Sequence, residues 1–346
     1  MKEPKLTSLT HGGGCGCKIS PTVLNEILSK TENIPIPPEL IVGTETCDDG
    51  AVYKINDNLS IVVSTDFFMP VVDDPYNFGE ISATNAISDI YAMGAKPIFS
   101  LAIVGMPVEI LSTETISKIL SGGSSICKKA GIPIAGGHTI DSSEPIYGLV
   151  VVGLVETKNL KKNSGSKIGD KLILGKPIGV GVYSAALKKN DLSVNLYERM
   201  IKYTTQLNSI GYDLGKLDCV NSITDITGFG LLGHSMEMAL GSNKSIELFF
   251  KKIIFHDDVK QLVDKGFFTG ASSRNWESIK DEIFLGSDLS YVDKILLTDP
   301  QTSGGLMVSV ESNNAKEVLR MFHQQGYTAS EVGNVIKKNK FSVMVY

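Results

Sequence analysis

The chain has 346 residues, of which 42% are hydrophobic, and it carries a formal net charge of −5 at pH 7. This length predicts about two domains, and the hydrophobic content suffices for two ordinary cores. The acidic balance argues against a nucleic-acid-binding protein, which would show a basic face. No apolar run approaches the roughly 20 residues that cross a bilayer, and the first residues lack the pattern of a secretory signal. We therefore expect a cytoplasmic protein with neither a nucleic-acid nor a membrane partner.

The segment His11–Lys18 (HGGGCGCK) places two thiols and an ammonium group among four glycines. Because glycine adopts positive φ at little cost, we expect residues 1–20 to form a flexible lid over a ligand. The cation of Lys18 should lower the pKa of Cys15 below the usual value of about 8.5 and make this thiol reactive. The alternative is a disordered glycine-rich terminus without chemistry. The five cysteines are too scattered for a disulfide framework, and no C-x-x-C pair indicates a zinc site.

Apolar runs of strand length alternate with helical patterns through the first half of the chain. The expected strands are residues 59–66, 96–105, 132–135 and 146–155, and the expected helices are residues 78–93 and 114–130. This alternation predicts an α/β domain over residues 21–156. Residues 157–170 are polar and rich in lysine, which is typical of a linker. Strand and helix patterns then resume, so we expect a second α/β domain over residues 171–346.

Acidic and amide side chains follow the ends of expected strands or share a helix face. They belong to Asp48, Asp49, Asp66, Asn85, Asp89 and Asp225. Asn85 and Asp89 are four residues apart on the expected helix, so their side chains lie on one face. Oxygen ligands without histidine or thiolate suit a hard cation such as Mg²⁺, which commonly bridges to substrate phosphates. The alternative is that these residues are helix caps and turn formers.

The familiar phosphate-binding signatures are missing. There is neither a G-x-x-x-x-G-K-[ST] loop nor a G-x-G-x-x-G motif that opens a helix. If a nucleotide binds, metal ions and other glycine turns must hold its phosphates. The candidate turns are residues 135–139, which directly follow an expected strand, 227–230 and 302–305.

Seven motifs occur in order along nearly the whole chain. They are HGGGCGCKIS (11–20), TETCDDGAVY (44–53), STDFFMP (64–70), ATNAISDIYAMG (83–94), AGGHTID (135–141), TDITGFGLLGH (224–234) and DPQTSGGL (299–306). Together they closely resemble the selenophosphate synthetase family. The resemblance implies the fold of the aminoimidazole ribonucleotide synthetase superfamily, with an N-terminal α/β domain contributing to a dimeric β-barrel and a C-terminal α/β domain. It also implies that ATP, selenide and water give selenophosphate, AMP and orthophosphate, which supplies activated selenium for selenocysteine and selenouridine.

The same resemblance implies roles for individual residues. Cys15 matches the catalytic cysteine, and Lys18 matches an essential lysine that contacts the ATP phosphates. Asp49, Asp89 and Asp225 match the Mg²⁺ ligands, to which Asn85 is a plausible addition. The implied ATP-binding residues are Lys18, Thr46, Cys47, Asp48, Asp66, Asp89, Gly137, His138 and Thr139. The last three match a segment that reaches ATP across the interface of a homodimer. Cys47 departs from the arginine that can occur there, which puts that one contact in doubt.

Two other functions stay open. One is a related ATP-dependent enzyme of the same superfamily, acting in purine, thiamine or hydrogenase-cofactor synthesis. The segment Cys15–Lys18 speaks against it, because those relatives lack this lid. The other is a non-catalytic selenium or redox carrier that binds nucleotide as a regulator.

Overall fold

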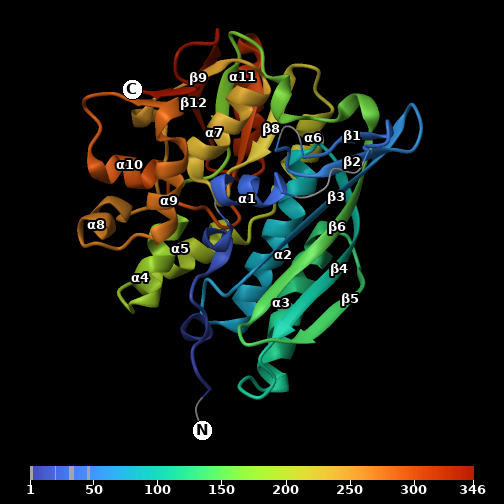
Figure 1. The fold of residues 1–346 in the computed structure, drawn as a ribbon, viewed down its shortest axis with the longest axis vertical. Helices are drawn as coiled ribbons and strands as arrows, with labels where there is room; N and C mark the ends of the chain where they lie inside the picture. Colours follow the sequence, from blue (N-terminus) through green and yellow to red (C-terminus); the bar gives the residue numbers. More distant parts are fainter. Residues whose placement is uncertain (1–2, 20, 31–34, 45–46) are drawn as a thin grey trace.

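The structure is a computed structural model that describes residues 3–19, 21–30, 35–44 and 47–346. It consists of two mixed α/β halves, each built on one sheet (Figure 1). The amino-terminal residues, dark blue in Figure 1, rise between the two halves and end in the short helix α1 (Pro21–Leu28). No helix in the described part of the chain is long and apolar enough to span a membrane.

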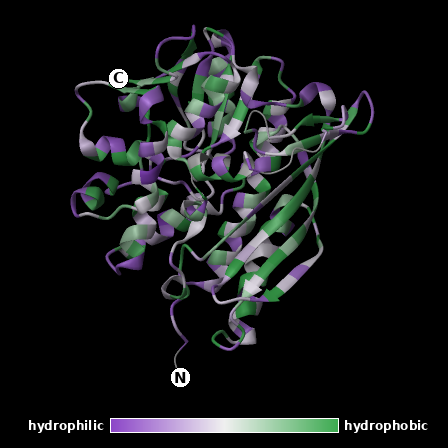
Figure 2. Ribbon diagram, in the orientation of Figure 1, coloured by the Kyte–Doolittle hydropathy of each residue, from purple (hydrophilic) through white to green (hydrophobic). Residues whose placement is uncertain are grey.

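The first sheet has six strands in the order β1-β2-β3-β6-β4-β5. Their bounds are β1 (Leu40–Val42), β2 (Ala51–Lys54), β3 (Leu59–Phe68), β4 (Lys96–Met106), β5 (Ile134–Asp141) and β6 (Ile146–Glu156). β4 and β5 pair in parallel, and the other neighbours are antiparallel. Hydrophobic residues run along these strands in Figure 2. The sheet stays open with β1 and β5 as its edges, so the described residues of one chain form no closed barrel.

Helices α2 (Pro75–Ala92) and α3 (Thr113–Ala130) lie on one face of this sheet (Figure 1). α2 begins at Pro75 because the side chain of Asp74 accepts a hydrogen bond from the backbone N–H of Asn77. Glycines let the two helices touch: a Cβ on Gly79 would lie 1.9 Å from the Ile119 carbonyl oxygen. A Cβ on Gly122 would meet the α2 backbone at 2.0 Å. Every residue of α2 from 78 to 92 is buried, so its polar side chains need partners inside the protein.

The second sheet has seven strands in the order β10-β13-β9-β12-β7-β11-β8. Their bounds are β7 (Lys171–Leu174), β8 (Val220–Asp225), β9 (Ser245–Leu248), β10 (Ile283–Leu285), β11 (Leu306–Val310), β12 (Ser330–Ile336) and β13 (Val343–Val345). The helices of this half are α4 (Val180–Lys188), α5 (Val194–Thr204), α6 (Ile210–Gly215), α7 (Gly230–Gly241), α8 (Val259–Asp264), α9 (Gly270–Ile279), α10 (Tyr291–Leu297) and α11 (Ala315–Gln324).

The polar segment 157–170 packs against the second half instead of being fully solvated. Lys161 is buried, and its ammonium group donates to the carbonyl oxygens of Leu217 and Val220. Asp170 is also buried and accepts a hydrogen bond from Ser309 at 2.7 Å. The polar composition of this segment therefore does not mean that it is exposed. The second half supplies hydrogen-bond partners for its buried polar groups.

The helices and strands expected in the first half are present, with ends that differ by a few residues. One expectation is wrong: residues 135–139 are not a turn after a strand but the interior of β5. Gly136 and Gly137 have φ values of 142° and 150°, which glycine adopts readily. A Cβ on Gly137 would lie 2.0 Å from the carbonyl oxygen of Ala102, so glycine allows this close approach of β5 to β4.

Candidate active site

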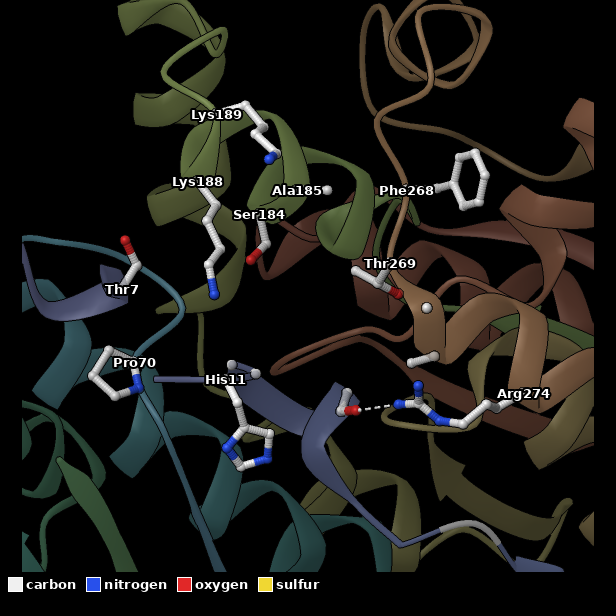
Figure 3. A pocket seen from close by; sticks show the side chains of 15 residues that line it. Thr7, His11, Pro70, Ser184, Ala185, Lys188, Lys189, Phe268, Thr269 and Arg274 are labelled. Atoms are coloured by element: carbon white, nitrogen blue, oxygen red, sulfur yellow. Dashed lines mark hydrogen bonds between the residues drawn. The ribbon is translucent and has the colours of Figure 1, made fainter. Parts of the chain in front are cut away.

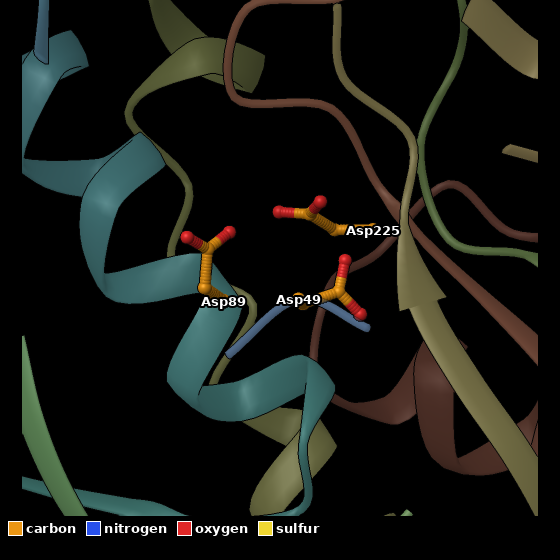
Figure 4. Close-up of side chains that lie close together, drawn as sticks. All are labelled: Asp49, Asp89 and Asp225. Atoms are coloured by element: carbon orange, nitrogen blue, oxygen red, sulfur yellow. The ribbon is translucent and has the colours of Figure 1, made fainter. Parts of the chain in front are cut away.

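Three aspartates meet where the two halves face each other (Figure 4). Asp49 lies just before β2, Asp89 lies on α2, and Asp225 is the last residue of β8. One carboxylate oxygen from each lies within 4.8 Å of the others. The site therefore takes ligands from both halves of the chain.

Hydroxyl groups hold each of the three carboxylates. Ser64 donates to Asp89, Ser88 donates to Asp225, and Thr224 donates to Asp49 at 3.0 Å. These bonds fix the orientation of the carboxylates in the buried interface.

The three aspartates bring negative charge together and include a hydrogen-bond acceptor without a partner. The Oδ2 atom of Asp49 is buried and has no hydrogen-bond partner among the described residues. Burial raises the pKa of all three carboxyls, and neighbouring carboxylates raise it further. An oxygen-rich, anionic cluster with an unpartnered acceptor has the donor chemistry that a hard divalent cation requires.

A second group of residues adjoins the aspartate cluster and centres on Asn85. The Nζ atom of Lys18 lies 3.3 Å from Oδ1 of Asp66, on β3. The other oxygen of Asp66 accepts from Nδ2 of Asn85 at 2.6 Å. The carboxylate of Asp66 raises the pKa of Lys18 above its ordinary value, so the lysine is a cation. Asn85 and Asp89 lie on the same face of α2, as their spacing predicted.

Cys15 is buried beside this group. Its Sγ donates to Oδ1 of Asn85 at 3.1 Å, and its backbone N–H donates to Oγ1 of Thr302 at 3.2 Å. Gly14 precedes it with φ of 56°, and a Cβ there would lie 2.2 Å from Thr302 Oγ1. A glycine at position 14 is therefore required for the close contact between this segment and the loop of residues 302–305.

The expected pKa of Cys15 is wrong in direction. Burial raises the pKa of this thiol, and the negative charge of Asp66 adds to the rise, while Lys18 opposes it. Lys18 lowers the pKa less than expected because it is paired with Asp66 and because other carboxylates lie near the sulfur. The thiol therefore keeps its proton in this arrangement of charges.

The structure brings some of the expected site residues together and places others elsewhere. Those that gather are Cys15, Lys18, Asp49, Asp66, Asn85, Asp89 and Asp225. Asp48 accepts from the backbone N–H of Asn163 at 2.6 Å, and Cys47 is exposed with φ of 51°. Thr46 lies outside the described residues. The segment 137–139 is exposed on the edge strand β5, which β6 and β4 separate from β3, so it does not reach the aspartates of its own chain.

Several residues that support the site could hardly be predicted from the sequence. Ser303 donates its backbone N–H to Oδ1 of Asn85 at 2.7 Å, and its carbonyl accepts from Lys176. Lys176 is fully buried, and burial lowers its pKa to about 7. The loop 302–305 was a candidate phosphate turn, but in the structure it holds Cys15 and Asn85. The available signal for Lys176 was a lysine two positions after the apolar run 172–174, beyond Gly175.

Family models match both halves of the chain. The N-terminal domain of AIR synthase related proteins matches residues 47–155, and the C-terminal domain matches residues 167–346. The chain therefore belongs to the AIR synthase related proteins. Enzymes that transfer phosphoryl groups from ATP generally use a divalent cation, which agrees with the aspartate cluster.

Curated relatives place the chain more narrowly, among the selenide, water dikinases. It is 56% identical over 331 residues to the selenide, water dikinase of Pseudomonas straminea, covering 95% of this chain and 92% of that protein. It is 53% identical over 335 residues to that of Paraburkholderia xenovorans, covering 96% and 95%. The similarity therefore covers nearly the full length of both proteins and includes both halves of this chain.

Solved structures with low sequence identity share the fold. Thiamine-monophosphate kinase from Stenotrophomonas maltophilia matches with a TM-score of 0.64 at 15% identity, covering 94% of each chain. The corresponding kinase from Aquifex aeolicus matches with a TM-score of 0.63 at 15% identity, covering 94% of this chain and 95% of that one. These matches concern the fold alone.

Proposed function

We propose that this chain makes selenophosphate, with ATP, selenide and water giving selenophosphate, AMP and orthophosphate. The observation that carries the proposal is the placement of the Cys15 thiol and the Lys18 cation against Asn85 and Asp66, directly beside three clustered aspartates. A phosphoryl-transfer site alone would account for the aspartates. A buried thiol in the same site calls for a second, soft substrate such as selenide.

Asp49, Asp89 and Asp225 would hold Mg²⁺, which neutralises charge on the ATP phosphates when it is bound. Their support is the unpartnered Oδ2 of Asp49 and the mutual closeness of the three carboxylates. Lys18 would contact the phosphates with charge-assisted hydrogen bonds, since its side chain is 39% exposed and Asp66 is its one ion-pair partner among the described residues. Residues 1–20 would act as the lid that brings both Lys18 and Cys15 to the transferring group.

The Cys15 side chain is a protonated thiol before nucleotide binds. Its proton lies on Sγ and is donated to Oδ1 of Asn85. Positive charge entering near Asp66 and Asp89 would offset the carboxylates that raise its pKa, and so favour the thiolate. The arrangement thus keeps the thiol protonated until the nucleotide and its counterions are in place.

We also propose a homodimer in which the first sheets of two chains form a β-barrel, with residues 137–139 of one chain reaching the ATP of the other. The support is the face of the first sheet opposite α2 and α3, which no described helix covers. Large apolar side chains are exposed on it, including Tyr53, Val63 and Phe67. The other proposed ATP contacts are Thr46, Cys47, Asp48, Asp66 and Asp89. A reducing compartment such as the cytoplasm suits the free thiols.

The direct test is anaerobic ³¹P NMR of the purified protein with ATP, Mg²⁺ and selenide. We expect resonances of selenophosphate, AMP and orthophosphate in equal amounts. AMP or ADP without a phosphorus–selenium resonance would reject the proposal and favour another ATP-dependent reaction of the family. No selenide-dependent consumption of ATP would favour a carrier.

The proposed metal ligands have their own test. Asp49→Asn, Asp89→Asn and Asp225→Asn should each weaken Mg²⁺-dependent ATP binding, since each removes an anionic ligand. The matched control is Asp264→Asn, on α8 in the second half. If two of the three variants titrate like the parent in calorimetry, the aspartates are structural.

A further inference from the structure

A cavity of about 390 Å³ lies along the amino-terminal segment (Figure 3), and none of the three clustered aspartates lines it. Four parts of the chain enclose it: the amino-terminal residues 7–16, Pro70, the end of α4, and the start of α9. Its side chains include Lys188 and Lys189 from the end of α4, and Thr269 and Arg274 from the start of α9. Both Lys188 and Arg274 point toward the amino-terminal segment in Figure 3.

The lining of this cavity is basic. Lys188, Lys189 and Arg274 contribute cations, and none of the described residues that line it is acidic. Lys188 donates to the Thr10 carbonyl at 3.0 Å, and Arg274 donates to the Gly16 carbonyl at 3.2 Å. Each of these cations keeps further N–H groups that those single bonds do not use. Lys189 is exposed, and its side chain makes no hydrogen bond or ion pair within the described chain.

The basic cavity continues toward the thiol. A second, smaller cavity of about 10 Å³ is lined by Cys15, Lys18, Gly228 and Asn275, among others. The two cavities share Gly16, Ala271 and Arg274. A space of this size holds about one water molecule. The smaller cavity is therefore a narrow continuation of the larger one, and it ends at Cys15.

Electrostatics separates the two approaches to Cys15. On the aspartate side, a small anion meets Asp49, Asp66, Asp89 and Asp225, and ATP itself is a polyanion that would fill that side. On the cavity side, the lining offers three cations, and the nearby carboxylate of Glu144 is paired with His11 at 3.0 Å. A basic cleft raises the local concentration of an anion and the rate at which it arrives. Selenide is a small anion near neutral pH, so the charge distribution favours the cavity side.

We propose that the basic cavity is the entry site for the anionic selenium substrate, which passes Arg274 and Ala271 to reach Cys15 while ATP occupies the aspartate side. The inference rests on the proposed function, since it assigns a route to the second substrate of that reaction. Lys188, Lys189 and Arg274 attract and hold the anion. They act before chemistry and touch neither the nucleotide nor the transferring phosphoryl group.

The first experiment measures steady-state kinetics of Lys189→Ala, Lys188→Ala and Arg274→Ala. We expect KM for selenide to rise about fivefold for each cation removed, with KM for ATP within twofold of the parent. Lys189→Ala is the cleanest variant, because its side chain has no structural contact to lose. Lys128→Ala, at the exposed end of α3, removes one charge elsewhere and should leave both constants unchanged.

The second experiment does not depend on turnover. In a Cys17→Ser background with Mg²⁺ and a non-hydrolysable ATP analogue, Cys15 is alkylated by anionic iodoacetate or by neutral iodoacetamide, and peptide mass spectrometry gives both rates. The cavity should favour the anion, so Lys189→Ala and Arg274→Ala should lower the ratio of iodoacetate to iodoacetamide rates at least threefold. Lys128→Ala should not change it.

The outcomes separate this inference from the proposed function. If the parent makes no selenophosphate, the function fails, while the alkylation ratio still tests the route. If the parent makes selenophosphate but neither the ratio nor KM for selenide responds to Lys189→Ala, the route is overturned and selenide enters from the nucleotide side. Equal rises in KM for ATP and for selenide would also overturn it, because the cations would then merely hold the segment 10–16 in place.

Discussion

Replacing Asn85 by alanine should both destabilise the protein and free the Cys15 thiol. Asn85 is fully buried and accepts from Cys15 Sγ and from the Ser303 N–H, while it donates to Asp66. Two neutral hydrogen bonds contribute about 1 kcal/mol each and the bond to a carboxylate about 2, so we expect a loss of about 4 kcal/mol. Urea unfolding followed by circular dichroism, with EDTA present, measures it. Alkylation of Cys15 by iodoacetamide should also be faster in the variant.

Two controls define the result. Asn77→Ala lies on the same helix and loses one hydrogen bond, to the Tyr197 hydroxyl, so it should cost only about 1 kcal/mol. Asn85→Asp keeps both acceptor contacts but faces Asp66 with a second carboxylate, so it should recover stability as the pH falls. If Asn85→Ala loses no more than Asn77→Ala, or if Cys15 reacts at the parent's rate, Asn85 does not organise the site.

Three further predictions concern the thiol, the lid and acid stability. Cys15→Ser should abolish selenide-dependent AMP formation while ATP still binds with near-normal affinity. Cys17→Ser should reduce AMP formation less. Unchanged selenophosphate yield in Cys15→Ser would remove the role given to this thiol. Hydrogen exchange at residues 11–18 should slow with Mg²⁺ and an ATP analogue, because nucleotide contacts at Lys18 would add to the hydrogen bonds that Cys15 makes to Asn85 and Thr302. Equal exchange in both states would contradict a lid. Burial lowers the pKa of His256 to about 3, so the unfolded chain binds a proton there that the folded chain does not, and stability falls as the pH drops below about 6.5. Between pH 6.5 and 5 this costs about 2 kcal/mol, which His256→Phe should abolish in parallel urea titrations; identical pH profiles would refute it.

Much of the first half could be predicted from the sequence because its signals are local. The β-branched run that begins at Leu59 and the acid that follows it gave β3 and Asp66, and a spacing of four residues put Asn85 and Asp89 on one face. Helix α2 is buried from residue 78 to 92 and has little amphipathic pattern, so its start at Pro75 depended on the cap by Asp74. Local sequence pattern thus predicts the presence of helices and strands better than the residues at which they begin and end.

What could not be predicted depends on contacts between distant parts of the chain. The rise in the pKa of Cys15 reflects burial and carboxylates that come from β3, α2 and β8, whereas the sequence shows only the neighbouring lysine. Lys176 and Ser303 support Asn85 from the second half, and no spacing rule connects them. The glycine pair in β5 resembles a turn in the sequence, because the close approach to Ala102 leaves no trace in local sequence.

The glycine contact between α2 and α3 widens the set of positions on which the site depends. No side chain separates the two helices at Gly79 and Gly122, so a methyl group at either position must move one backbone away from the other. α2 carries Asn85 and Asp89, and such a movement would therefore displace a thiol partner and a carboxylate together. Substitutions on the far side of α2 from the ligands can inactivate the protein without touching any of them. A survey of inactivating variants should accordingly find α3 enriched, although α3 supplies no residue to the site.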